Sequence, residues 1–205
     1  MNMFKRTLAA LSLAALASSL AACITLLPEE KAAQLYRFDG DIAPPVAAQG
    51  SQFTVARLGG SFVQAASNDR IMTTTGSQVA YIAQSRWVSP ASVLFNEALS
   101  RAFDANAGPA RLLTRGDAGK ADYILRVDVT QFEANYDRGA KAAPEVVVSM
   151  RATLTGANRS LAGSTHFEAR VRAGSNRVSA IVAAYDQAVA QALGELVAWT
   201  NGKGA

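Results

Sequence analysis

Residues 123–130 read YILRVDVT, residues 146–154 read VVVSMRATL, and residues 161–172 read LAGSTHFEARVR. Apolar and polar residues alternate along all three segments. This alternation is typical of β-strands with one buried face, because successive side chains of a strand point to opposite faces of the sheet. The connections between the segments are short, which favours antiparallel pairing of neighbours. The three segments therefore predict the antiparallel part of a sheet.

Two longer segments repeat their apolar residues at helical spacing. The first covers residues 89–106 and the second residues 176–200. We expect Ser89 to cap the first helix and Pro90 to occupy its first helical position, where a missing N–H is not needed. Each helix has one apolar stripe, so both are expected to pack on the sheet.

Shorter strands are expected between the amino terminus and the alternating segments, with a hairpin turn at Gly76. A chain of 205 residues is long enough for one domain with a core of its own. The fold class predicted is α/β, with a mixed, largely antiparallel sheet packed by two long amphipathic helices. The shorter strands are expected at residues 35–38, 53–58, 70–74, 78–83 and 111–114.

The start of the chain, residues 1–23, reads MNMFKRTLAALSLAALASSLAAC. A basic start, an uncharged apolar run and small residues at the end are typical of a secretory signal peptide, here residues 1–22. The last residues of this segment are similar to the lipobox of bacterial lipoproteins, in which a Leu and two small residues precede an acylated cysteine. They are Leu20, Ala21, Ala22 and Cys23.

Two other interpretations of this leader stay open. Residues 7–27 carry no charge, and about 20 apolar residues can span a bilayer, so an uncleaved anchor is one alternative. The other is plain cleavage with Cys23 as an ordinary residue. The Ala- and Ser-rich composition disfavours a stable span, and Cys23 is the only cysteine of the chain. Lipidation of Cys23 is therefore the preferred prediction.

Lipidation would divide the chain into a signal peptide at residues 1–22, a lipidated tether at 23–34 and a single domain at 35–205. No cofactor is expected beyond a diacylglycerol and an N-acyl chain, such as palmitate, on Cys23. Ile24 follows the cysteine, where an Asp would retain many Gram-negative lipoproteins in the inner membrane. We therefore expect the outer membrane, with the domain on its periplasmic face.

The formal net charge of +4 comes from 20 basic and 16 acidic residues. Two basic residues lie in the leader, so the mature chain keeps 18 against 16. The arginines are dispersed, and only Arg170, Arg172 and Arg177 approach a cluster, for which a solvated strand edge is the preferred interpretation. Contact with lipid headgroups or an acidic partner is the alternative. Nucleic-acid binding generally needs a basic patch, so no nucleic-acid partner is expected.

Catalytic and metal-binding patterns are largely missing from the sequence. His166, the only histidine, shares a strand face with Glu168, which would allow a hydrogen bond. The sequence places no Ser, Cys or second His to complete a nucleophilic site. Residues 115–120, RGDAGK, lack the spacing of a phosphate-binding loop. We expect a protein that is not an enzyme and holds no metal.

Several short motifs, taken in order, resemble those of the ABC-type transport auxiliary lipoprotein family. A tyrosine strand follows the anchor, a second tyrosine precedes an Arg-Trp pair and a proline that opens a helix, and an Ala-Asp-Tyr strand follows. The last helix ends near a tryptophan. The residues that carry the resemblance are Tyr36, Phe38 (where the family has Leu), Tyr81, Arg86, Trp87, Pro90, Ala121 to Leu125, and Trp199.

The resemblance implies a sandwich similar to the anticodon-binding domain and a role in lipid transport between the membranes. The implied partners are an MCE-domain (mammalian cell entry) protein and its ABC transporter complex, with a homo-oligomer as a further possibility. The motif residues are interpreted first as structural, with Trp87 covering the open end of the core and Arg86 pairing with an acid, and second as partner contacts. A lipid-carrying or envelope-assembly lipoprotein that acts without an ABC transporter is the alternative function.

Overall fold

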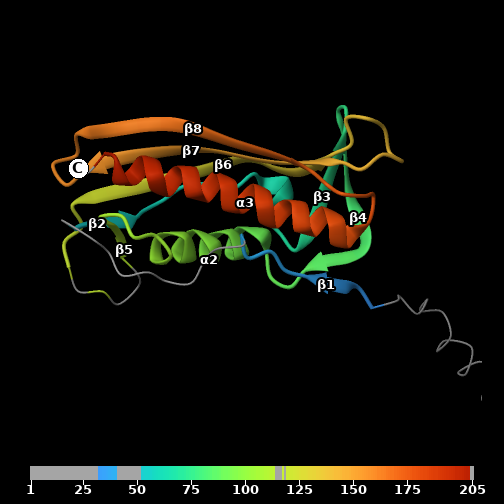
Figure 1. Cartoon of the computed structure of the whole chain (residues 1–205), viewed down its shortest axis with the longest axis horizontal. Helices are drawn as coiled ribbons and strands as arrows, with labels where there is room; N and C mark the ends of the chain where they lie inside the picture. The colour runs from blue at the N-terminus through green and yellow to red at the C-terminus, as the bar shows by residue number, and fades with distance from the viewer. Residues whose placement is uncertain (1–31, 41–51, 114–116, 118, 204–205) are drawn as a thin grey trace, which may run out of the picture. The chain divides into compact units, whose positions relative to one another are not determined.

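The structure is a computed structural model that describes residues 32–40, 52–113, 117 and 119–203. The chain divides into two units between Ala32 and Ala33, and the described domain is essentially the second. It is an α/β domain in which a mixed sheet of eight strands packs against two helices (Figure 1). In chain order the elements are β1 (Gln34–Tyr36), β2 (Phe53–Arg57), the short 3-10 helix η1 (Gln64–Ala66), β3 (Arg70–Thr75), β4 (Gln78–Trp87), α2 (Ala91–Asp104), β5 (Ala110–Leu113), β6 (Tyr123–Asn135), β7 (Glu145–Gly156), β8 (Leu161–Arg172) and α3 (Val178–Asn201).

The three alternating segments form the long antiparallel part of the sheet, as predicted. β6 pairs with β7 and β7 pairs with β8, both antiparallel. Along β7 the even-numbered residues from Val146 to Leu154 are buried in the core between sheet and helices. The opposite face carries Arg151 and Thr153, which are less buried. The alternation of the sequence therefore matches the two faces of this part of the sheet.

The other edge of β6 is shared by two strands that come from distant parts of the chain. β2 runs parallel to β6 at its beginning, with Val55 opposite Tyr123, and β3 runs parallel to it at its end, with Thr73 opposite Ala134. β1 runs parallel to β4, and β5 parallel to β2. These parallel pairs make the sheet mixed.

A glycine allows the close approach of the chain to β6 just after β2. Gly60 has a φ of 99°, and a Cβ added there would lie 2.2 Å from the carbonyl oxygen of Val127. Only glycine tolerates both this backbone conformation and this approach without strain. The next segment then makes a bridge between Phe62 and Val129.

Both helices cover the same face of the sheet, and α3 packs on β7 and β8 (Figure 1). α2 ends at Asp104, two residues before the predicted end, and α3 spans Val178–Asn201 against a predicted range of 176–200. Within the part of the chain that the structure describes, neither helix combines the length and apolarity needed to cross a membrane.

The predicted cap of α2 is wrong. Pro90 is the residue before the helix, with ψ at 135°, and no side chain caps the helix. The first N–H groups instead donate to a neighbouring loop, from Ala91 to the carbonyl of Asn68 and from Ser92 to the carbonyl of Ser67. Because tertiary contacts satisfy these donors, Ser89 is not needed as a cap.

The hairpin at Gly76 is confirmed, but β4 is longer than predicted. Gly76 has a positive φ of 57° in the two-residue turn between β3 and β4. β4 continues beyond Ala83 to Trp87, because β1 pairs with its last three residues. β1 is in turn shorter than predicted and ends at Tyr36, so that Phe38 is free to turn into the core.

Four aromatic side chains from separate segments meet at the centre of the core. Phe38 packs edge-on against Trp87 at 5.0 Å between ring centroids and lies 5.3 Å from Phe132. Tyr185 of α3 completes the group, 5.2 Å from Trp87 and 4.9 Å from Phe132. All four are at most 2% exposed. We call Phe38, Trp87, Phe132 and Tyr185 the aromatic cluster.

The aromatic cluster makes Phe38 a sensitive position for stability. Phe38→Ala should lower the free energy of unfolding by about 3–5 kcal/mol, because a fully buried ring is replaced by a cavity. Urea denaturation followed by circular dichroism would measure it. Leu161→Ala is the control, since Leu161 is 67% exposed and its truncation should change stability by no more than about 0.5 kcal/mol. Equal effects at the two positions would contradict the central role of the aromatic cluster.

Candidate functional sites

The motif residues on β4 make contacts inside the domain. Trp87 is 2% exposed, within the aromatic cluster and not over an open end of the core. Arg86 donates from Nη1 to both carboxylate oxygens of Asp69, at 3.1 and 3.2 Å. The Tyr81 hydroxyl donates to the carbonyl of Ala65, and the guanidinium of Arg70 lies 3.8 Å from the centre of the Tyr81 ring. These contacts hold the segment between η1 and β3 against β4.

Tyr36 and Pro90 lie on either side of the end of β4. The carbonyl of Tyr36 accepts a 2.7 Å hydrogen bond from the Val88 N–H, which fixes β1 beside the start of α2. The carbonyl of Pro90 accepts from Val93 and Leu94 as the helix begins. Four of the motif residues therefore lie around one junction of β1, β4 and α2, namely Tyr36, Arg86, Trp87 and Pro90. Tyr81 lies further back on β4, against η1 and β3.

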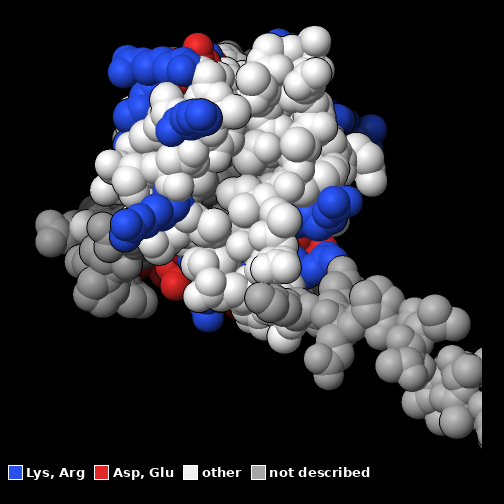
Figure 2. Space-filling view, turned by 90° about the vertical axis from the view of Figure 1, so that its right-hand side faces the viewer, with Lys and Arg blue, Asp and Glu red and all other residues white. Residues whose placement is uncertain are grey.

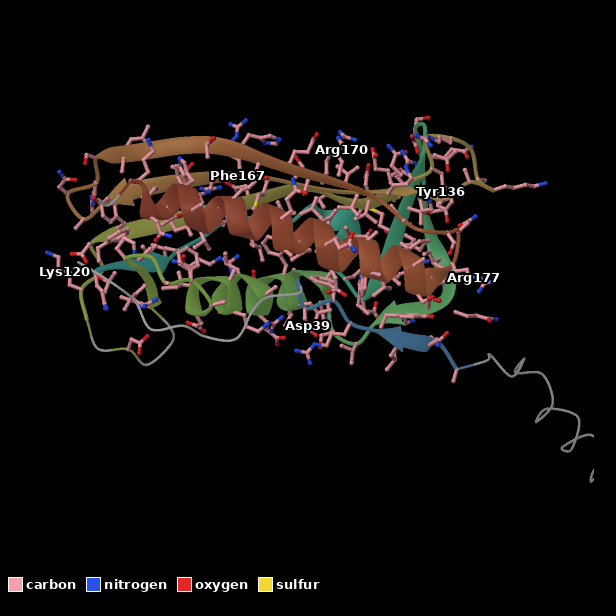
Figure 3. The ribbon with its side chains drawn as sticks, viewed as in Figure 1. Asp39, Lys120, Tyr136, Phe167, Arg170 and Arg177 are labelled. Carbon is pink, nitrogen blue, oxygen red and sulfur yellow. The ribbon has the colours of Figure 1, made fainter. Side chains whose placement is uncertain are left out.

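A hollow lies beside the exit of β1, lined by Asp39, Ala183, Asp186 and Gln187. Asp39 is labelled in Figure 3. Its two carboxylates already have partners. Asp39 pairs with Arg37 at 2.7 Å and with Arg101 at 3.1 Å. Asp186 accepts from the N–H groups of Asp39 and Gly40. The residues around the hollow therefore connect the chain after β1 to both helices. The two carboxylates form the ion pairs and hydrogen bonds that make this connection.

Asp122, within the Ala-Asp-Tyr motif, joins β2 to β6. Its Oδ2 accepts from both the N–H and the hydroxyl of Thr54, each at 2.8 Å. Its own N–H donates to the Thr54 carbonyl at 3.0 Å. The two hydrogen bonds from Thr54 lower the pKa of the Asp122 carboxyl below its ordinary value. The motif was visible in the sequence, but the partner of its aspartate was not.

His166 has a partner that the sequence did not indicate. Its Nε2 lies 3.0 Å from Oγ of Ser149, which is 1% exposed on the neighbouring strand. The hydrogen bond to Glu168 that a shared strand face would allow is not formed, and Glu168 instead accepts from Nε of Arg170 at 2.7 Å. Arg151 is directly opposite His166 in the strand pair, and Ser149 lies diagonally across from it, within reach of the imidazole side chain.

The Ser149 and His166 pair lacks the other parts of a nucleophilic site. Glu168, the acid on the same strand face, is engaged by Arg170, whose hydrogen bond lowers the pKa of that carboxyl. A working triad needs an acid that orients the histidine and donors for an oxyanion. Among the described residues, no group of three or more His, Cys, Asp or Glu side chains could hold a metal ion.

The cluster of Arg170, Arg172 and Arg177 separates into two parts in the structure. Arg170 pairs with Glu145 and Glu168. Arg172 binds both carboxylate oxygens of Asp137 and also pairs with Glu145 at 3.2 Å. Arg177 lies apart at the start of α3, at the far end from Lys120 (Figure 3). The first two arginines thus belong to an ion-pair network along the strand edge, as the preferred interpretation has it.

The residues predicted for lipid attachment, Leu20, Ala21, Ala22 and Cys23, lie outside the described residues. Their role stays a prediction. The described domain has a polar sheet face that carries Arg–Glu ion pairs. Its core is apolar, and the described residues include no set of side chains arranged for catalysis. The chain enters the domain at β1.

Comparison with solved structures gives the same architecture. Protein XCC0632 from Xanthomonas campestris, a DUF330 protein, has 24% sequence identity and a TM-score of 0.72, over 84% of this chain and 97% of that chain. An uncharacterized protein has 15% identity and a TM-score of 0.64, over 83% of this chain and 99% of that chain. These likenesses show the fold. A search of curated proteins finds no match.

The fold and its contacts define an α/β domain in which a mixed sheet packs against two helices. A family model described as the ABC-type transport auxiliary lipoprotein component matches residues 36–197. The chain belongs to this family. It is thus a transport auxiliary lipoprotein associated with an ABC transport system, and the resemblance seen in the sequence is confirmed.

The Asp122 carboxylate gives a prediction for acid stability. A carboxyl whose pKa is lower in the folded state than in the unfolded state stabilises the folded protein at pH values above its ordinary pKa of 3.8. This stabilisation is lost as the pH falls through the pKa of the carboxyl in the folded protein. The free energy of unfolding of Asp122→Asn should therefore be lower than that of the unmodified protein near neutral pH, with the difference narrowing below about pH 4. Urea denaturation across a pH series would measure it.

Asp104→Asn is the matched control for this prediction. Asp104 is exposed at the end of α2 and forms no hydrogen bond or ion pair with another described residue. Its substitution should leave the difference from the unmodified protein constant over the same pH range. A constant difference for Asp122→Asn would contradict the role of its ionised carboxylate.

Proposed function

We propose that this protein is a non-enzymatic accessory of an MCE-type lipid transport system, anchored in the outer membrane by acylated Cys23. Family membership over residues 36–197 is the observation that carries the transport role. The lipobox from Leu20 to Cys23 supports the anchor, and Ile24 in place of an aspartate favours the outer membrane. In this proposal residues 1–22 are the signal peptide, 23–34 the tether and 35–205 the single domain.

The contacts of the described domain are consistent with a binding role without catalysis. The side chains that could do chemistry have structural partners, as for Asp122 with Thr54 and Glu168 with Arg170. We propose that the domain contributes surfaces for an MCE-domain protein and the ABC transporter, that it needs no cofactor beyond the acyl chains on Cys23, and that nucleic acid is not among its partners. Assembly with further copies of the chain is part of the same proposal.

Replacing Cys23 tests the anchor. Cys23→Ser should move the protein from the outer-membrane fraction to the soluble periplasmic fraction, because the only acylation site is removed. Fractionation followed by immunoblotting would measure the distribution. Ser19→Ala, four residues upstream and outside the lipobox, is the control and should leave the protein in the membrane. Outer-membrane fractionation of Cys23→Ser equal to that of the control would contradict lipid anchoring.

Crosslinking in intact cells, followed by purification, tests the partnership. We expect an MCE-domain protein to be recovered with the acylated protein and to be identified by mass spectrometry. Its reproducible absence would count against the transport partnership. Lipid recovered in stoichiometric amounts with the purified domain, without an MCE protein, would favour instead a lipoprotein that carries lipid independently of an ABC transporter.

A further inference from the structure

One end of the domain differs from the other because the chain from the leader enters there. β1 begins at Gln34 on the side where α3 also begins (Figure 1). The chain between Cys23 and Ala33 contains ten peptide steps and spans at most about 36 Å when extended. β6, with 13 residues, is about 43 Å long at about 3.3 Å per residue. A tether at Cys23 therefore holds this end, here called the entry end, nearest to the bilayer.

The segments at the entry end are held together by hydrogen bonds. The Tyr136 N–H donates to the carbonyl of Thr74, which joins the loop after β6 to the β3 and β4 hairpin. The Tyr136 hydroxyl donates to Asn176 Oδ1 at 2.8 Å, and Asn176 Nδ2 donates to the carbonyl of Ala140 at 3.1 Å. The loop, the hairpin and the start of α3 thus form one continuous surface.

The charge of this surface is positive. Residues 136–145 and 172–178 together carry four basic residues, Arg138, Lys141, Arg172 and Arg177, and two acidic ones, Asp137 and Glu145. Both acids pair with Arg172. Lys141 and Arg177 are exposed and form no ion pair with a described residue. Arg138 pairs loosely with Asp137 at 3.8 Å, but its side chain is 70% exposed. Figure 2 looks at this end and shows basic side chains around a largely uncharged surface, with acidic atoms only at the margins.

The amino terminus of α3 adds to this positive potential. α3 begins at the entry end and has no acidic residue in its first turn, whereas α2 runs in the same direction but begins nearer the middle of the domain (Figure 1). A helix amino terminus carries the equivalent of about half a positive charge. At the opposite end, where Lys120 lies (Figure 3), the same helices present their negative carboxyl termini. The basic side chains and the amino terminus of α3 therefore reinforce each other at the entry end.

Exposed apolar side chains accompany the basic ones. Leu35 on β1 is 60% exposed, Val88 beside it is 50% exposed, and Val79 in the hairpin is 54% exposed. Aliphatic side chains next to basic ones suit the boundary between lipid headgroups and acyl chains.

We propose that the entry end is a docking surface for an anionic bilayer, formed by Arg138, Lys141 and Arg177 with Leu35, Val79 and Val88. The proposal builds on the anchoring proposed above, which brings this end to the membrane. The acyl chains confine the domain to the bilayer, and the basic surface orients it with the sheet and both helices upright on the headgroups. The opposite end then faces away from this membrane.

Vesicle binding by the unacylated protein tests the docking surface separately from the anchor. The mature chain, residues 23–205, with Cys23→Ser would be sedimented with phosphatidylcholine vesicles that contain about 30% phosphatidylglycerol. We expect binding to these vesicles, weaker binding at high salt because the attraction is screened, and little binding to pure phosphatidylcholine. Absence of any preference for the anionic vesicles would overturn the proposal, whatever the fractionation of the acylated protein shows.

Two charge-matched triple variants locate the surface. Arg138→Gln, Lys141→Gln and Arg177→Gln together should weaken binding about tenfold or more, since one basic residue near an anionic surface contributes about fivefold. The control is Lys120→Gln, Arg159→Gln and Lys203→Gln, which removes the same charge elsewhere and should have little effect. Equal losses in the two variants would overturn the proposal. Unchanged vesicle binding with loss of a co-purified protein in the first variant would assign the surface to an acidic protein partner instead.

Discussion

The aromatic cluster is the interaction on which the rest of the domain depends. β1 has only three residues and pairs with one strand, so its hydrogen bonds alone cannot hold the start of the domain. Phe38, just beyond β1, is fully buried between Trp87 and Phe132. The Tyr185 hydroxyl donates to the carbonyl of Met72 and connects α3 to β3, and burial raises the pKa of this phenol well above its usual value. A force applied to the chain before β1, for example by a lipid anchor, would therefore be transmitted to the core through the contacts of Phe38 with Trp87 and Phe132.

The second organising feature is β6, which forms hydrogen-bonded pairs with three strands. β7 occupies one edge along nearly its whole length, while β2 and β3 share the other edge at opposite ends. Both helices then cover a single face, and the other face remains polar. Ion pairs of Arg170 and Arg172 with acids on β7, β8 and the preceding loop occupy part of that face. Charged side chains of this kind also discourage unwanted pairing at the free edge of β8.

The motif residues by which the sequence resembles its family are mainly buried or internally paired. Trp87 packs in the core, Arg86 binds Asp69, and Asp122 binds Thr54. Their contacts help to fix the arrangement of strands within the range that matches the family model. Functional contacts would then come from the exposed charges and the ends of the domain. The entry end combines such features because the amino terminus of α3 adds to its side-chain charge.

Local patterns in the sequence determined much of this protein. The period of two from residue 123 to residue 172 fixed three strands and their buried faces, the helical spacing gave both helices to within two residues, and the lipobox at Cys23 identified the proposed anchor. Only the tertiary structure decided that β2 and β3 share β6, that Ser149 lies against His166, and that loop carbonyls replace Ser89 at the start of α2. The physical reason is that periodicity reports which face of an element is buried, whereas partners such as Thr54 and Asp122 are 68 residues apart and are selected by how the finished elements pack.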